Sequence, residues 1–205
     1  MHIPSGETNT IPILDFQSAL QESAKPVETY DVNKWLFVPN AYDEYRYILG
    51  TKGKNPLICC GINPSTAKPD DLDNTLKSAE RIALFNGFDS FIMLNIYAQR
   101  ATNPDDMEKN FNPFLHTENV KAFSYALSLC QGENPTVWAA WGTIIEKRPF
   151  LQNCLKDFLK VGNKQHVHWV SAGKVSKKGH PHHPLYLKKD SILEDFDMKS
   201  YEASF

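Results

Sequence analysis

Polar and glycine-rich residues collect in four short segments of this 205-residue chain, and each segment follows an apolar run. The segments are residues 61–66, 95–102, 141–142 and 171–186. Amide, hydroxyl, imidazole and guanidinium groups predominate in them, and these groups hydrogen-bond planar ligands or stabilise anions. We therefore predict that the four segments form one ligand site.

The first of these segments, residues 61–66, places an amide inside a rigid turn. Gly61 permits a tight turn, Pro64 restricts the backbone, and Asn63 between them offers both a donor and an acceptor. A turn in which the asparagine only caps the loop accounts for the same residues equally well. The aspartates that follow are interpreted as helix-start residues, with a metal or acid–base role as the alternative; they are Asp70, Asp71 and Asp73.

A loop rich in histidine and lysine occupies residues 171–186. His180, His182 and His183 suggest a zinc site, but no cysteine or carboxylate stands at a companion spacing, so we predict neither a metal nor a cofactor. Basic residues surround these histidines. They form either a solvated loop or a rim that binds a nucleic-acid backbone, and the lysines assigned to that rim are Lys174, Lys177 and Lys178.

The composition is typical of a globular protein, with 41% hydrophobic and 22% charged residues. A formal net charge of -2 argues against a protein coated by nucleic acid but allows a local basic patch. The chain lacks an apolar run of membrane-spanning length and the residue order of a secretory signal, so we expect no membrane partner and a cytoplasmic location. The cysteines are expected to be reduced core residues, and they are Cys59, Cys60, Cys130 and Cys154.

The alternation of apolar runs with amphipathic stretches predicts the elements that position the site. The expected strands are residues 45–49, 57–60, 90–94, 136–140 and 166–170. Three helices are expected between them, and their limits are Asp73 or Asn74 to the stop at Gly87, residues 117–129, and Pro149 to the stop at Gly162.

Buried strands separated by such helices predict an α/β fold, a three-layer α/β/α sandwich around a central, mainly parallel sheet. Residues 1–43 contain repeated prolines and are expected to form an arm packed on a single domain of residues 44–205. In sheets of this kind, ligands bind outside the carboxyl ends of the strands. The four polar segments stand at those ends.

Several motifs, taken together, resemble one family of bacterial and phage proteins, the domain of unknown function sixteen-forty-three. The resemblance covers about residues 44–187, and the family name implies no particular reaction. The motifs are Arg46 to Leu49, Gly61 to Ala67, Asp73 to Thr75, Asn95 to Thr102, Trp138 to Gly142 and His183 to Leu187.

A more distant resemblance is to the uracil-DNA glycosylase superfamily, especially its mismatch-specific uracil/thymine branch. The order of four motifs is similar, and they are residues 61–64, 95–102, 138–142 and 183–184. The resemblance implies a glycosylase-like fold in which Asn63 positions the attacking water, Asn95 contacts the base and His183 lies against it.

The chain departs from that superfamily at two places next to the implied pocket. Ser65 and Thr66 replace the glycine or the tyrosine and histidine that follow the proline in active branches, and the late motif reads His-Pro-Leu-Tyr. The aspartate of the more active branches is also missing from the first motif. A neutral amide can position water but cannot accept its proton, which favours binding without chemistry.

We therefore expect a protein that recognises a nucleobase or nucleotide, in DNA or free, and that cleaves an N-glycosidic bond through Asn63 and His183. A binding module without chemistry and a small-molecule enzyme on the same fold are the alternatives. No obligate protein partner is inferred. The expected ligand contacts are Gly61, Ser65, Phe85, Asn95, Tyr97, Arg100, Trp141 and Tyr186, with Phe85, Tyr97 or Trp141 stacking on the base.

Overall fold

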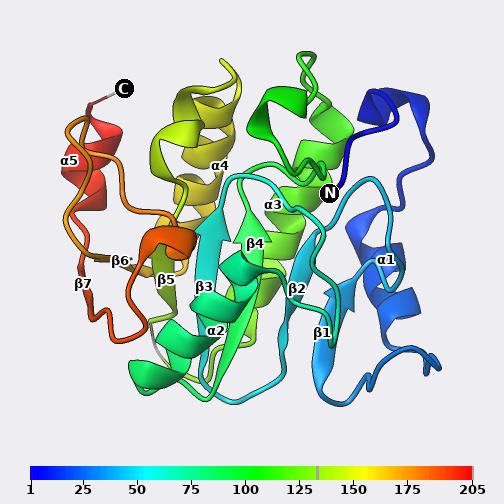
Figure 1. The fold of residues 1–205 in the computed structure, drawn as a ribbon, viewed down its shortest axis with the longest axis horizontal. Helices are drawn as coiled ribbons and strands as arrows, with labels where there is room; N and C mark the ends of the chain where they lie inside the picture. Colours follow the sequence, from blue (N-terminus) through cyan, green and yellow to red (C-terminus); the bar gives the residue numbers. More distant parts are fainter. Residues whose placement is uncertain (133, 205) are drawn as a thin grey trace.

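A single β-sheet runs through the fold (Figure 1). The computed structural model describes residues 1–132 and 134–204, and seven strands within them lie in the order β1-β2-β4-β3-β5-β6-β7. The strands are β1 (Trp35–Val38), β2 (Ile48–Thr51), β3 (Pro56–Gly61), β4 (Ser90–Asn95), β5 (Thr136–Ala139), β6 (His168–Ala172) and β7 (Leu193–Asp195).

The four central strands, β4, β3, β5 and β6, are parallel to one another. Antiparallel strands flank them, with β2 and β1 on one side and β7 on the other. Strands β3 and β4 are buried at every position, which is typical of parallel strands covered on both faces. The predicted α/β class with a parallel central sheet is therefore confirmed.

Helices cover both faces of this sheet. Alternate residues of β3 join two separate apolar clusters, Ile58 and Cys60 on one face and Leu57 and Cys59 on the other. The first cluster includes residues of α1, α3, α4 and α5, and the second includes residues of α2. The helices are α1 (Phe16–Ser23), α2 (Asn74–Phe85), α3 (Pro113–Ser128), α4 (Leu151–Lys164) and α5 (Met198–Glu202), with short 3-10 turns η1 (Thr8–Thr10), η2 (Pro104–Asp106), η3 (Gly142–Glu146) and η4 (Pro184–Tyr186).

Helix α2 has the limits that its sequence predicts. The Asp73 carboxylate accepts a hydrogen bond of 2.9 Å from the Leu76 amide and so caps the helix, and Gly87 beyond its end has a φ of 85°. Helix α3 begins earlier than predicted because Asn112 caps it and Pro113 occupies its first turn. Gly162 does not stop α4, which continues to Lys164; a methyl group on Gly162 would meet Trp169 at 3.4 Å.

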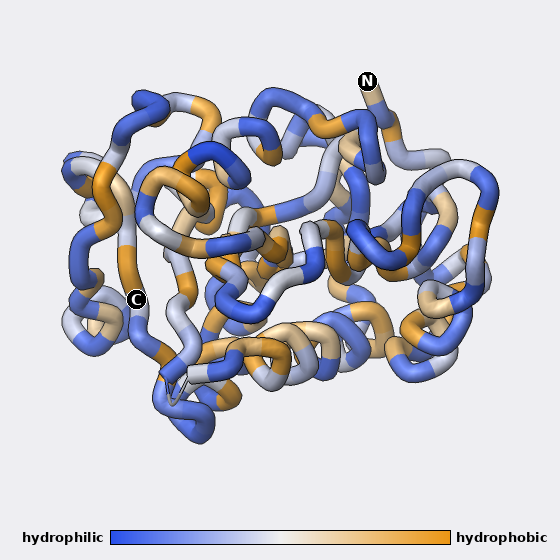
Figure 2. The backbone as a smooth tube through the Cα atoms, turned by 90° about the horizontal axis from the view of Figure 1, so that it is seen from below, coloured by the Kyte–Doolittle hydropathy of each residue, from blue (hydrophilic) through white to orange (hydrophobic). Residues whose placement is uncertain are grey.

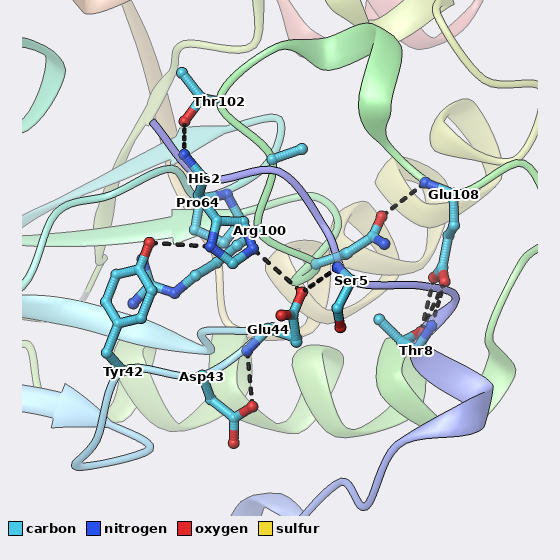
Figure 3. Close-up of polar contacts among 12 residues, drawn as sticks. His2, Ser5, Thr8, Tyr42, Asp43, Glu44, Pro64, Arg100, Thr102 and Glu108 are labelled. Atoms are coloured by element: carbon cyan, nitrogen blue, oxygen red, sulfur yellow. Dashed lines mark hydrogen bonds and ion pairs between the residues drawn. The ribbon is translucent and has the colours of Figure 1, made fainter.

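Residues 1–43, the expected arm, do more than cover the domain, because they supply elements of the fold itself. They supply the edge strand β1, which pairs with β2 through Phe37 and Leu49, and helix α1, which packs against α3. Their first residues also run beside the loop that follows β4, where the amide of His2 donates to Thr102 (Figure 3).

The distribution of apolar residues follows these layers. Figure 2 shows hydrophobic segments gathered in the interior, with hydrophilic segments in the outer loops. Cys59, Cys60 and Cys154 are buried free thiols and Cys130 is half-buried, in keeping with their expected place in the core. In residues 1–132 and 134–204, no helix combines the length and the apolar content that crossing a bilayer requires.

Candidate functional site

A cleft of about 670 Å³ opens at the carboxyl ends of the parallel strands. The chain leaves β3 through α2 to β4 on one side, whereas β5 lies on the other side of β3. Loops that leave adjacent strands in opposite directions create a crevice at this point of a doubly wound sheet. The volume is in the range of small-molecule sites.

Six of the residues that the sequence predicts for the site line this cleft. They come from the loop after β3, the end of β4, the end of β5 and the loop after β6, which are far apart in the chain but adjacent at this edge of the sheet. The six residues are Asn63, Ser65, Asn95, Trp141, His183 and Tyr186.

Asn63 ties the loop after β3 to the loop after β4. Its amide nitrogen donates to the carbonyl of Ala101 at 2.6 Å and to the carbonyl of Pro64 at 3.2 Å. These bonds orient the side chain and leave its Oδ1 without a partner among the described residues. The amide is therefore held in place with one acceptor available to a ligand or a water molecule.

His183 lies across the cleft, at the start of η4, beside the turn that ends β5. That turn contains Gly142, whose φ of 60° allows the backbone to pass close to the histidine. The Nδ1 atom of His183 accepts a long hydrogen bond of 3.4 Å from the Leu185 amide, so the neutral ring carries its proton on Nε2. Burial lowers the pKa of this imidazole below its ordinary value of 6.5, against a smaller opposing effect of the Asp73 carboxylate.

The pKa of His183 predicts how stability changes with pH. Below pH 6.5 the unfolded chain binds a proton that the half-buried ring of the folded protein does not yet bind, so the free energy of unfolding falls as the pH is lowered. The His183→Gln variant is expected to lose less stability than the wild type between about pH 7.5 and 5. His116 has a pKa lowered in the same direction by burial, so the variant that also carries His116→Gln should lose least.

Urea denaturation at several pH values measures this difference. An equal loss of unfolding free energy in wild type and the single variant would show that the His183 ring is not protected from protonation.

Two aromatic residues of the cleft differ in what they can offer a ligand. The Trp141 side chain is fully buried, and its indole nitrogen donates to the Tyr201 hydroxyl at 2.9 Å, so its ring is not free to stack on a base. Tyr186 is 79% exposed and its ring lies at the mouth of the cleft, 6.2 Å from the His183 ring. Tyr186 is thus the aromatic residue with an available face.

Four predicted ligand contacts lie outside the cleft, and they are Phe85, Tyr97, Gly61 and Arg100. Phe85 is exposed at the carboxyl end of α2, whereas the amino end of this helix lines the cleft, about 16 Å away along the axis. Tyr97 is fully buried, and its hydroxyl donates to the Glu108 carboxylate and accepts from the Asn112 amide. Gly61 ends β3 beneath the site, where a side chain would meet Met93 and Asn95.

Arg100 also lies outside the cleft, although the sequence places it there. It is fully buried, and its guanidinium faces the Tyr42 ring at 4.3 Å (Figure 3). It also donates to the carbonyls of Ser65 and Ala67. Because the amino-terminal residues and Tyr42 cover Arg100, its guanidinium does not face the cleft. Its hydrogen bonds instead hold the loop after β3, so Arg100 is a positioning residue.

The predicted basic rim is solvent-exposed and does not line the cleft. Lys174 and Lys177 are exposed, and Lys178 forms an ion pair of 2.5 Å with Glu146 of η3. The acidic partner comes from a different segment, so inspection of the histidine-rich loop alone could not reveal it. Among the residues that the structure describes, no group of three or more histidine, cysteine, aspartate and glutamate residues could hold a metal ion.

Two further charged residues, Arg46 and Asp73, line the cleft. Arg46 is 1% exposed, and its Nη2 donates to the Asn95 side chain at 3.2 Å. Among the described residues, Asp73 is the one acidic residue that lines the cleft. One of its carboxylate oxygens caps α2. A charged residue within an apolar run was the available signal for Arg46.

A comparison with protein families matches residues 46–185 to the family described as Protein of unknown function (DUF1643). The chain belongs to the DUF1643 family. No curated protein and no solved structure matches it.

The DUF1643 segment contains almost the whole of the cleft. The match begins at Arg46 and ends at Leu185, and both residues line the cleft. Tyr186 stands one residue beyond the match, and residues 1–43 lie outside it. The cleft is therefore formed by the family's own segment rather than by the amino-terminal residues.

Proposed function

We propose that this DUF1643 protein recognises a nucleobase in the cleft and hydrolyses the N-glycosidic bond that joins the base to its sugar, in DNA or in a nucleotide. The observation that supports this most directly is the presence of Asn63, Asn95 and His183, from three separate loops and strand ends, in one cleft of about 670 Å³. Two amides suit the donors and acceptors on the edge of a base, and an imidazole suits a leaving group that departs with negative charge.

The reaction requires water to attack the sugar carbon while the bond to the base breaks and its electron pair leaves with the base. The free Oδ1 of Asn63 can orient that water, and the Asp73 carboxylate, in the same cleft, can accept the proton that the water loses. The Nε2–H group of His183 can donate to the departing base. Tyr186 supplies an exposed ring on which the base can stack.

The strand arrangement is compatible with this proposal. The parallel strands lie in the order second, first, third, fourth along the chain, and ligands of such sheets bind where the order reverses, between β3 and β5. The glycosylase-like fold and the resemblance to the uracil-DNA glycosylase superfamily belong to the proposal and rest on the four sequence motifs.

One observation favours a second function, nucleobase binding without chemistry. Both hydrogens of the Asn63 amide are engaged by carbonyls of the protein, at 2.6 and 3.2 Å, as expected of a residue that fastens two loops. Such a residue can shape a pocket without taking part in a reaction.

Base release separates these functions. The substrates are single-stranded and duplex DNA with uracil, a mismatched thymine or a modified base, together with free nucleotides, and the released base is measured by chromatography. We expect Asn63→Ala and His183→Ala each to slow release by about a hundredfold or more, because each removes a group that acts in the transition state. Phe85→Ala, on the surface away from the cleft, is the control and should keep the wild-type rate.

The outcomes are distinct. Wild-type protein that binds a base or nucleotide but releases none would establish the binding module. Neither binding nor release across the whole panel would contradict nucleobase recognition and leave a small-molecule enzyme.

A further inference from the structure

Two buried arginines beside the cleft lack the anionic partners that buried charges require. Arg46 is 1% exposed and Arg100 is fully buried. Among residues 1–132 and 134–204, neither forms an ion pair with a carboxylate. Buried cations are normally paired or hydrogen-bonded throughout, so this pair is an exception that needs an explanation.

The hydrogen bonds of the two guanidinium groups are also incomplete. Arg46 donates to the Ala67 carbonyl at 3.3 Å and to Asn95 at 3.2 Å, and its Nε has no partner among the described residues. Arg100 donates to the same Ala67 carbonyl at 3.2 Å, while its Nε and Nη2 are unpartnered among those residues. The two guanidinium groups thus share one neutral acceptor, the Ala67 carbonyl, and each has at least one nitrogen without a hydrogen-bond partner among the described residues.

Burial opposes the charged form of both guanidinium groups. Burial and the neighbouring Arg100 lower the pKa of Arg46 to about 9, and burial lowers the pKa of Arg100 to about 10. The Asp73 carboxylate attracts both groups, and the Asp43 and Glu44 carboxylates also attract Arg100, but these attractions do not offset the effect of burial. An anion that bound beside Arg46 in the cleft would favour its charged form.

The amino end of α2 opens into the same cleft. Asn74 and Thr75 begin this 12-residue helix and line the cleft. Their amides belong to the first turn, where no carbonyl of the helix is available, and the helix dipole favours an anion there. The Asp73 side chain occupies only the Leu76 amide. The helix end and the buried Arg46 guanidinium therefore present donors to one space from different elements.

We propose that Arg46 and the amino end of α2 form a phosphate subsite in the cleft, and that the ligand is a nucleotide with a terminal phosphate. This inference rests on the proposed nucleobase recognition and specifies its ligand. A terminal phosphate can reach a buried guanidinium, whereas a phosphate within a duplex is flanked by sugars on both sides. The position of Lys174 and Lys177 outside the cleft and the net charge of -2 also favour a free nucleotide over duplex DNA.

Calorimetric titration tests the subsite with three kinds of probe: inorganic phosphate, nucleoside 5′-monophosphates and the matching nucleosides. We expect the wild type to bind the monophosphate of its preferred base about ten- to a hundredfold more tightly than the nucleoside, because the guanidinium makes charge-assisted hydrogen bonds to the phosphate. Inorganic phosphate should raise the melting temperature more than chloride does at equal ionic strength.

The Arg46→Met variant should lose this preference for the phosphate while melting at or above the wild-type temperature without ligand, because it removes a buried charge that has no anionic partner. Arg46→Lys keeps the charge without the fork of donors and should weaken the preference by about tenfold. Arg81→Met removes the same charge from an exposed position of α2 outside the cleft and should bind like the wild type.

The proposal would be overturned by a wild type that binds the monophosphate no more tightly than the nucleoside. It would also be overturned by an Arg46→Met variant that still binds the monophosphate more tightly than the nucleoside. Duplex DNA that binds more tightly than every monophosphate would also overturn it. Nucleosides that bind as well as monophosphates would leave nucleobase recognition standing without the subsite. Phosphate binding without any gain from a base would leave the subsite standing without nucleobase recognition.

Discussion

The Gly50→Ala variant is expected to lose about 3–5 kcal/mol of unfolding free energy, a fall in melting temperature of about 6–20 °C. Gly50 lies in β2, and a methyl group on it would stand 2.2 Å from the Phe91 carbonyl oxygen and 2.7 Å from the Ile92 Cα of β4. These are backbone atoms of the adjacent strand, so the contact cannot be relieved by rotating a side chain. The β2–β4 pairing would have to separate, and the β1–β2 edge depends on it.

Thermal and urea denaturation measure the effect of Gly50→Ala. The matched control is Gly132→Ala, since nothing lies within 4 Å of a methyl group at that position and its backbone is not left-handed. The control should stay within about 0.5 kcal/mol of the wild type. Equal stabilities for the two variants would show that β2 can move away from β4 without cost.

The Glu108→Leu variant is expected to lose about 3–5 kcal/mol of unfolding free energy. The buried carboxylate accepts from the Thr8 amide at 2.7 Å and from the Thr8 hydroxyl at 2.8 Å (Figure 3). It also accepts from the Tyr97 hydroxyl. Leucine has a similar volume but no acceptor, so three buried donors would lose their partner. The amino-terminal residues would lose an anchor at the same time.

The controls for Glu108→Leu distinguish the loss of these hydrogen bonds from the mere loss of a carboxylate charge. Asp106→Leu removes an exposed carboxylate two residues away and should change the unfolding free energy by about 0.5 kcal/mol or less. A double-mutant cycle with Thr8→Ala should show a coupling of about 1–3 kcal/mol between Thr8 and Glu108. Additive effects would contradict a direct interaction between the two side chains.

Periodicity in the sequence was sufficient to place the central elements. The runs around Ile58 and Ile92 are apolar at successive positions, as required of strands buried on both faces, and they form β3 and β4. Asp73 and Gly87 mark the start and the end of α2 through cap chemistry that is local to the chain. Local signals of this kind survive in the folded protein because they do not depend on distant partners.

The sequence pattern also predicted the edge of the sheet at which the site lies. The residues after apolar strands were expected at the carboxyl edge of a parallel sheet, and Asn63, Asn95 and His183 do line one cleft there. Phe85 does not line the cleft because a helix of 12 residues carries its last residue away from the edge at which the helix begins. A residue that follows the site residues closely in the sequence can therefore lie far from the cleft.

Only the tertiary structure decided which polar residues face the cleft and which support it. Arg46 and Arg100 are both buried, yet Arg46 lines the cleft while Arg100 is covered by Tyr42. The difference arises because segments far apart in the chain, residues 1–43 among them, close over one guanidinium and leave the other beside the strand ends. Periodicity and cap residues report contacts between near neighbours in the chain, whereas burial and charge balance depend on neighbours that only folding brings together.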